Sequence, residues 1–321
     1  MNNQQLLLKS IQRKIDSTSS LIEEIARVLN ISYDASHRRV SMKSKFSIEE
    51  AVQLCLHYDI SMDNLIRQSS KIVVEKTSTI SKTEDLAQYL KESYNNLKEF
   101  QNKKGTQIYY SAKDIPLFYT IGGTLLSKFK LYVWSNLLTN QETMNSFDEF
   151  HLTQNTQQYA SELQKLYNSI QIHEIWNDTT INSTVQQISY FFESGLIDLK
   201  TALHLFDDVK QIIITIEKKC NQKDSNFNLY YNELIILNNN VLIVSENKMK
   251  LFIPYNMLGY FITTEEHTIN DTLKYFNHQL KNSKYLNFSG VREQKAFFNK
   301  AIQKINWHVE KVNNYFLENN F

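Results

Sequence analysis

Glycine and proline are almost absent from this sequence: the 321-residue chain contains 6 glycines and 2 prolines. Turn-rich sandwiches and barrels depend on these residues, so their scarcity favours long helices. Dinucleotide- and nucleotide-binding loops need closely spaced glycines beside the phosphates. The only adjacent pair is Gly122-Gly123, and neither glycine fingerprint occurs. We therefore expect a mainly helical protein outside the Rossmann and P-loop classes.

The charge of the chain is nearly balanced, with 35 basic and 34 acidic residues. This balance excludes a polybasic protein but not a local basic patch. At about 100–200 residues per domain, the length predicts two domains.

Cys55 and Cys220 are far apart and fit free thiols in a reducing compartment. There is no signal-peptide pattern, and Lys128 and Lys130 interrupt the most apolar segment, so we expect a cytoplasmic protein with no membrane association.

Residues 1–70 are predicted to form a domain of five short helices. Ser20 with Glu23, and Ser47 with Glu50, have the spacing of N-terminal capping boxes. The predicted helices cover residues 4–16, 21–29, 33–42, 47–58 and 61–66. Residues 71–81 are expected to be a linker or an edge strand.

Residues 82–321 are predicted to form a larger, mainly helical domain with an antiparallel meander. Short apolar runs between residues 228 and 254, among them 234–237, indicate three or so strands, and 107–111 indicates one more. The expected fold class is mostly α with a small β component (α+β). The predicted helices cover residues 82–102, 114–138, 156–171, 180–194, 198–220, 267–282 and 290–318.

The sequence SLIEEIARVLNISYDASHRRVSM, residues 20–42, has the spacing of a helix-turn-helix. Ala26 supplies the small residue that two closely crossing helices need. Asn30, four residues later, tolerates the left-handed turn between them. Ser32 then provides an N-cap for the second helix.

The continuation FSIEEAVQLCLHYDISMDNLI, residues 46–66, resembles the fourth and fifth helices of Cro/CI-type repressor domains. Over residues 1–68 the chain is similar to BetR-like, Cro/CI-type (XRE-like) bacterial helix-turn-helix transcriptional regulators. It departs from them in having Asn30 where glycine is commoner and no glycine in the 41–45 turn. The resemblance implies DNA binding by the helix at 33–42.

One face of the predicted helix 33–42 holds Tyr33, Ser36 and Val40, which we expect to pack inward. The opposite face is expected to enter the major groove. The predicted DNA-binding residues on or beside it are Asp34, His37, Arg38, Arg39, Ser41, Lys43 and Lys45.

These residues have different predicted roles. Arg38 has the donors for two hydrogen bonds to guanine, His37 can donate or accept, and Ser41 reaches a base or a phosphate. The cations Arg39, Lys43 and Lys45 are expected to contact phosphates. Asp34 either orients Arg38 one turn later or favours the start of the helix. Residues 33–46 carry four cations against one acid, so the positive charge of the domain is concentrated here.

The expected function is that of a sequence-specific DNA-binding transcriptional regulator. Double-stranded DNA and a second copy of the chain, forming a homodimer, are the expected partners. Residues 82–321 would supply dimerisation. Whether they also bind a small-molecule effector is left open by the sequence. The alternative is a protein-interaction or scaffold module without DNA binding, because residues 1–70 are nearly neutral as a whole.

An enzyme is not expected, and neither catalytic residues, a metal nor a cofactor are predicted. The sequence HEIWN at 173–177 lacks the second histidine of the zinc-protease motif. No cysteine pair has zinc-binding spacing.

The string YYSAKDIPLFY at 109–119 is a strand-to-helix junction that could hold a small anion at a helix N-terminus, or else simply add aromatics to the core. The three tryptophans, Trp134, Trp176 and Trp307, are expected in buried helix positions.

Overall fold

The computed structural model describes residues 2–16, 19–62, 72–139, 146–223, 225–287 and 291–320. The chain forms two compact units, residues 1–74 and 75–321. Most of the predicted fifth helix, 61–66, lies outside the described residues.

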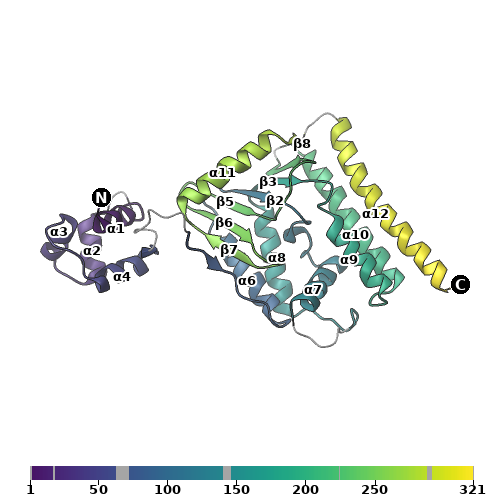
Figure 1. Cartoon of the computed structure of the whole chain (residues 1–321), viewed down its shortest axis with the longest axis horizontal. Coiled ribbons are helices and arrows are strands. Elements are labelled where there is room, and N and C mark those ends of the chain that lie inside the picture. The colour runs from purple at the N-terminus through teal and green to yellow at the C-terminus, as the bar shows by residue number, and fades with distance from the viewer. Residues whose placement is uncertain are drawn as a thin grey trace. The chain divides into compact units, whose positions relative to one another are not determined.

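The first unit is a small helical domain around one apolar core (Figure 1). Its described helices are α1 (Asn3–Gln12), α2 (Leu21–Leu29), α3 (Tyr33–Val40) and α4 (Ile48–His57). The capping box predicted at the start of α4 is confirmed, since the Ser47 hydroxyl accepts from the Glu50 amide and the Glu50 carboxylate accepts from the Ser47 amide. The capping box predicted at Ser20 is wrong, because its side chain forms no capping hydrogen bond. The buried core side chains are Leu7, Leu8, Ile11, Ile25, Leu29, Leu54 and Cys55.

The second unit is built on a mixed sheet of eight strands, in the order β1-β7-β6-β5-β2-β3-β4-β8 among the described residues. Strands β2, β3 and β4 are parallel, and every other neighbouring pair is antiparallel. The strands are β1 (Glu75–Lys76), β2 (Gln107–Ser111), β3 (Gln171–Trp176), β4 (Phe227–Tyr231), β5 (Val241–Val244), β6 (Met249–Pro254), β7 (Tyr260–Thr263) and β8 (Lys284–Tyr285).

Helical crossovers connect the three parallel strands, as parallel pairing requires. Helices α7 and α8 lie between β2 and β3 in the chain, and α9 and α10 lie between β3 and β4. The helices of this unit are α6 (Asp85–Lys98), α7 (Leu125–Leu138), α8 (Gln154–Asn168), α9 (Asn182–Glu193), α10 (Leu199–Cys220), α11 (Glu266–Lys281) and α12 (Val291–Asn320), with a 3-10 turn at Leu117–Tyr119. None of the described helices is both long enough and apolar enough to cross a membrane.

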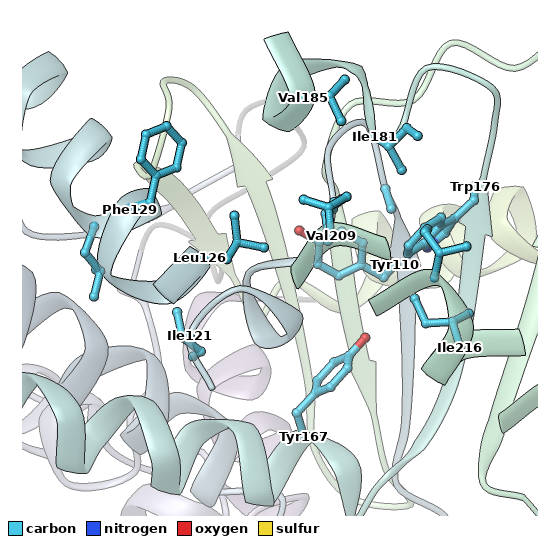
Figure 2. Packing of buried hydrophobic residues seen from close by; sticks show 14 of the residues in the cluster. Tyr110, Ile121, Leu126, Phe129, Tyr167, Trp176, Ile181, Val185, Val209 and Ile216 are labelled. Carbon is cyan, nitrogen blue, oxygen red and sulfur yellow. The ribbon is translucent and has the colours of Figure 1, made fainter. Parts of the chain in front are cut away.

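Both faces of the sheet are covered, and alternate residues of each strand point to opposite faces. On β2, Ile108 and Tyr110 belong to the larger core, while Tyr109 belongs to the smaller core that contains Ile269 and Phe276 of α11. Figure 2 shows part of the larger core, where residues of α7, α8, α9 and α10 surround Tyr110 and Trp176. The sheet is therefore buried on two sides, as is usual for sheets with parallel strands.

A carboxylate lies inside this core. The Glu174 side chain is fully buried on β3. It accepts hydrogen bonds from the hydroxyls of Tyr119 (2.8 Å) and Tyr167 (2.5 Å) and from the indole of Trp176 (2.7 Å). Burial raises the pKa of Glu174, although these three hydrogen bonds act in the opposite direction. The network joins β3, α8 and the 3-10 turn.

The α+β class is confirmed, but several predicted elements differ from those observed. The β component is larger than the predicted meander, because β3, β7 and the short edge strand β8 were not predicted. Within residues 71–81, predicted as a linker or an edge strand, the edge strand β1 is present at Glu75–Lys76. The apolar run 234–237 is no strand, and its Leu234 and Ile236 are more than nine-tenths exposed. Trp176 is buried but lies on a strand, whereas Trp307 on α12 is 58% exposed, so the predicted core position of Trp307 is wrong.

Candidate nucleic-acid interface

The turn between α2 and α3 has the geometry that the sequence predicts. Asn30 ends α2 in the left-handed conformation, with φ of 52° and ψ of 47°. The next amide, that of Ile31, donates to the Ala26 carbonyl at 3.0 Å, which satisfies a helix-end acceptor. The Ser32 hydroxyl then accepts from the Ala35 amide at 3.2 Å and caps α3. These local bonds fix how α3 leaves α2.

A buried serine holds the two helices together. Ser36 of α3 is fully buried, and its hydroxyl donates to the Ile22 carbonyl of α2 at 2.7 Å. Val40, one turn later, packs against the core of the unit. The predicted inward face of α3 is therefore correct at Ser36 and Val40.

Tyr33 is the exception, because its side chain is 55% exposed. It lies in the first turn of α3. Tyr33 joins Asp34, His37, Arg38 and Ser41, all of which are exposed. We call these five residues the outer face of α3.

The Arg39 side chain forms hydrogen bonds and an ion pair within the first unit. Its guanidinium donates to both oxygens of Glu50 on α4, at 2.9 and 2.6 Å, and to the Ala35 carbonyl at 3.1 Å. Only a fifth of either charged side chain is exposed. The hydrogen bond from Arg39 lowers the pKa of Glu50. Arg39 thus links α3 to α4, and its donors are already used within the protein, whereas the prediction assigned them to a phosphate.

The Arg39–Glu50 pair should contribute measurably to the stability of the first unit. We expect Arg39→Ala to lower the free energy of local opening by about 1–2 kcal/mol, since it removes two charge-assisted hydrogen bonds from a partly buried acid. Amide hydrogen exchange over α3 and α4, measured for Arg39→Ala, Glu50→Ala and the double variant, gives the coupling energy between the two side chains. Arg38→Ala is the control. Equal amide protection in Arg39→Ala and Arg38→Ala would show that the Arg39–Glu50 pair does not stabilise the unit.

The segment after α3 is also fixed by hydrogen bonds. The amides of Lys43 and Ser44 donate to the Arg38 carbonyl, at 2.8 and 3.1 Å. The Gln4 side chain of α1 donates to the carbonyls of Arg39 and Ser44, at 2.8 and 2.9 Å. It also accepts from the Phe46 amide at 3.2 Å. Gln4 thus orders this turn, a role that no local sequence signal indicates.

The side chains around this turn stay available for contacts outside the protein. Lys43 and Lys45 are exposed on either side of Ser44. The Ser41 hydroxyl donates to the His37 carbonyl at 2.6 Å, which leaves its oxygen free only as an acceptor for a further donor. Outside the Arg39–Glu50 pair, residues 33–46 present three cations, Arg38, Lys43 and Lys45, against Asp34. The six predicted interface residues other than Arg39 are therefore all exposed, and together they carry a net positive charge.

The anion site predicted at 109–119 is not supported by the structure. The predicted helix 114–138 begins only at Leu125, where the Thr124 hydroxyl caps α7. The Leu126 amide donates to the Asp208 carboxylate at 2.8 Å, so an acid of the chain already occupies this helix end. Tyr109 and Tyr110 are buried, which favours the alternative that these aromatics serve the core.

The side chains that could bind a metal or act as nucleophiles are dispersed over the described part of the chain. Among the described residues, no group of three or more His, Cys, Asp or Glu side chains is placed to hold a metal ion. Both cysteines are free, as predicted.

Comparison of the chain with protein-family models, with curated proteins and with solved structures gives no match. The first unit, with its helix-turn-helix geometry, is therefore the part of the chain that indicates a function.

Proposed function

We propose that the chain is a sequence-specific DNA-binding transcription regulator of the bacterial Cro/CI helix-turn-helix type. The observation that carries the proposal is the outer face of α3, which is exposed and flanked by Lys43 and Lys45 while the inner face is fixed to α2 through Ser36. A recognition helix needs this arrangement, because its base-reading side must be free and its orientation fixed. The proposal places the chain in the cytoplasm, where DNA is accessible.

In this proposal α3 lies in the major groove. Arg38 donates two hydrogen bonds to the O6 and N7 atoms of a guanine, and His37 contacts a neighbouring base edge. Asp34, one turn before Arg38, orients its guanidinium. Tyr33 and Ser41 are placed at the two ends of the face, within reach of the DNA backbone. Arg39 acts indirectly, by holding α3 on α4 through Glu50.

Lys43 and Lys45 are assigned to phosphates, which predicts a specific salt dependence. Each phosphate contact releases condensed counterions, so removing one should reduce the slope of log K against log salt by about 0.9. We expect Lys43→Gln and Lys45→Gln each to weaken binding to all duplexes alike. Fluorescence anisotropy with a labelled duplex, over a range of salt concentrations, measures the slope.

The matched control is Lys14→Gln. Lys14 is a lysine of the same unit whose ammonium donates to the Asp59 carbonyl beyond the end of α4. Its slope should equal that of the unchanged chain. If all three variants share one slope, Lys43 and Lys45 do not contact phosphates.

The second unit is proposed to bring two copies together and to sense an effector. A single helix-turn-helix reads one half-site, whereas two-fold dimers read inverted repeats. Helix α12 offers apolar surface for such a contact, with Trp307 and Leu317 each more than half exposed. Sedimentation of the full chain measures whether a homodimer forms.

A second candidate function is docking of a partner protein, and one feature favours it. Ile48, Val52 and Leu56 of α4 are exposed at four-residue spacing, which places them on one helix face. Ile48 and Leu56 are each at least three-quarters exposed. Apolar docking through this face would persist as salt is raised, whereas DNA binding would weaken steeply. Salt dependence therefore separates the two functions.

A further inference from the structure

An open cleft of about 560 Å³ lies beside α7 and α8 in the second unit. Its walls come from the start of α7, from the segment that precedes α8, and from the first half of α8. The volume is within the range of small-ligand sites, which is about 300–1,000 Å³. Gly123, with φ of 83°, forms part of the rim, and a side chain there would meet no neighbouring atom.

The floor of the cleft is apolar. Ile121, Leu131, Phe150 and Ala160 line it, and each is less than a tenth exposed. These side chains can remove an apolar body from water, which is the main source of affinity for most small ligands. Polar groups from Gln157 and Ser161 of α8 lie at its side and can fix orientation.

The ionisable side chains that line the cleft are basic. Lys128 and His151 line it, and among the described residues that do so there is no aspartate or glutamate. Lys128 is half-buried, and its ammonium lies 4.5 Å from the centre of the Phe147 ring. Within the described part of the chain, no carboxylate forms a salt bridge with Lys128. A partly desolvated cation without an acidic partner is suited to an anion from outside.

From this combination we propose that the cleft binds a small amphipathic anion, with an apolar body on the floor and a carboxylate or phosphate group at Lys128. The anion contact is assigned to the Lys128 side chain and not to the helix end, because Asp208 already accepts from the Leu126 amide. The inference rests on the proposed function only for its role as an effector. Binding itself is tested without DNA, so its failure is distinct from failure of DNA binding.

The test uses the full chain and 8-anilinonaphthalene-1-sulfonate, a fluorescent apolar anion, as the probe. We expect one saturable site from which decanoate displaces the probe at least about tenfold more effectively than the matched neutral decan-1-ol, since one charge-assisted hydrogen bond is at stake. Decyl phosphate is the third competitor. Whether decanoate or decyl phosphate is stronger identifies the acidic group, and either result supports the site.

Variants locate the site. Lys128→Gln should reduce the advantage of decanoate over decanol to about twofold or less, whereas Lys128→Arg should keep the full advantage. The control is Lys165→Gln, at an exposed lysine of α8 outside the cleft, which should leave the advantage unchanged. Ala160→Phe fills the floor and should abolish displaceable probe binding. Circular dichroism checks whether Ala160→Phe is folded. If this variant unfolds, the comparison of Lys128→Gln with Lys128→Arg still decides the test. Equal displacement by decanoate and decanol, or equal behaviour of Lys128→Gln and Lys165→Gln, overturns the proposal.

Discussion

Replacing Arg38 with alanine is expected to weaken binding of the chain to its preferred duplex by about 5- to 150-fold, which corresponds to about 1–3 kcal/mol. Arg38 is exposed on the outer face of α3, and its side chain has the two-pronged donor geometry that matches guanine in the major groove. The loss should be accompanied by relaxed discrimination at one base position. Binding to unrelated duplexes should fall much less, because phosphate contacts dominate there.

The experiment compares dissociation constants for the preferred duplex and for duplexes altered at single positions. Arg27→Ala is the matched control, since Arg27 is an exposed arginine of α2 that pairs with Glu24 and lies outside the outer face of α3. Its affinity should stay within about twofold of the unchanged chain. If Arg38→Ala keeps both affinity and base preference, α3 is not docked as proposed.

The second large effect concerns the stability of the second unit. Glu174→Ala should lower its free energy of unfolding by about 3–5 kcal/mol, since the donors of Tyr119, Tyr167 and Trp176, two of them fully buried, lose their acceptor. All three tryptophans of the chain lie in residues 75–321, so tryptophan fluorescence during urea unfolding reports on this unit alone. A loss below about 1 kcal/mol would show that the network is dispensable.

Glu174→Gln is the comparison for the pH dependence, because its side chain does not titrate. Its amide NH2 group takes the place of an oxygen that accepts a hydrogen bond, so its stability is compared as a slope with pH and not as an absolute value. Burial raises the pKa of Glu174, so the folded state holds its proton at pH values where the unfolded state has lost it. The stability that this group contributes is therefore present at low pH and is lost as pH rises through the raised value. The native chain should lose stability relative to Glu174→Gln as pH rises above the ordinary glutamate range. An opposite slope contradicts this assignment.

The elements that could be predicted from sequence are those determined by local chemistry. The left-handed turn at Asn30, the cap at Ser32 and the capping box at Ser47 each depend on residues within a few positions of one another. The amphipathic long helices followed from periodicity for the same reason. The sequence also identified Ser36 as an inward residue of α3, since helical spacing determines which side chains share a face.

Elements that depend on distant partners could not be predicted in this way. Strand β3 contains Glu174, a residue that a buried strand excludes unless donors from other elements satisfy it. The sequence of α3 does not reveal that Arg39 pairs with Glu50, eleven residues away on another helix. The helix expected from residue 114 begins at Leu125, because a 3-10 turn and Gly122-Gly123 come first. In each case tertiary contacts override a local preference.

The central claim, sequence-specific DNA reading by α3, is tested most directly by selection from a random duplex library. The full chain and its Arg38→Ala variant are each incubated with the library at about 0.15 M salt, and the retained duplexes are sequenced. We predict that the unchanged chain enriches an inverted repeat containing a guanine in each half-site, and that Arg38→Ala loses preference at that guanine. Retention of no sequence above the starting library by the unchanged chain would contradict the claim.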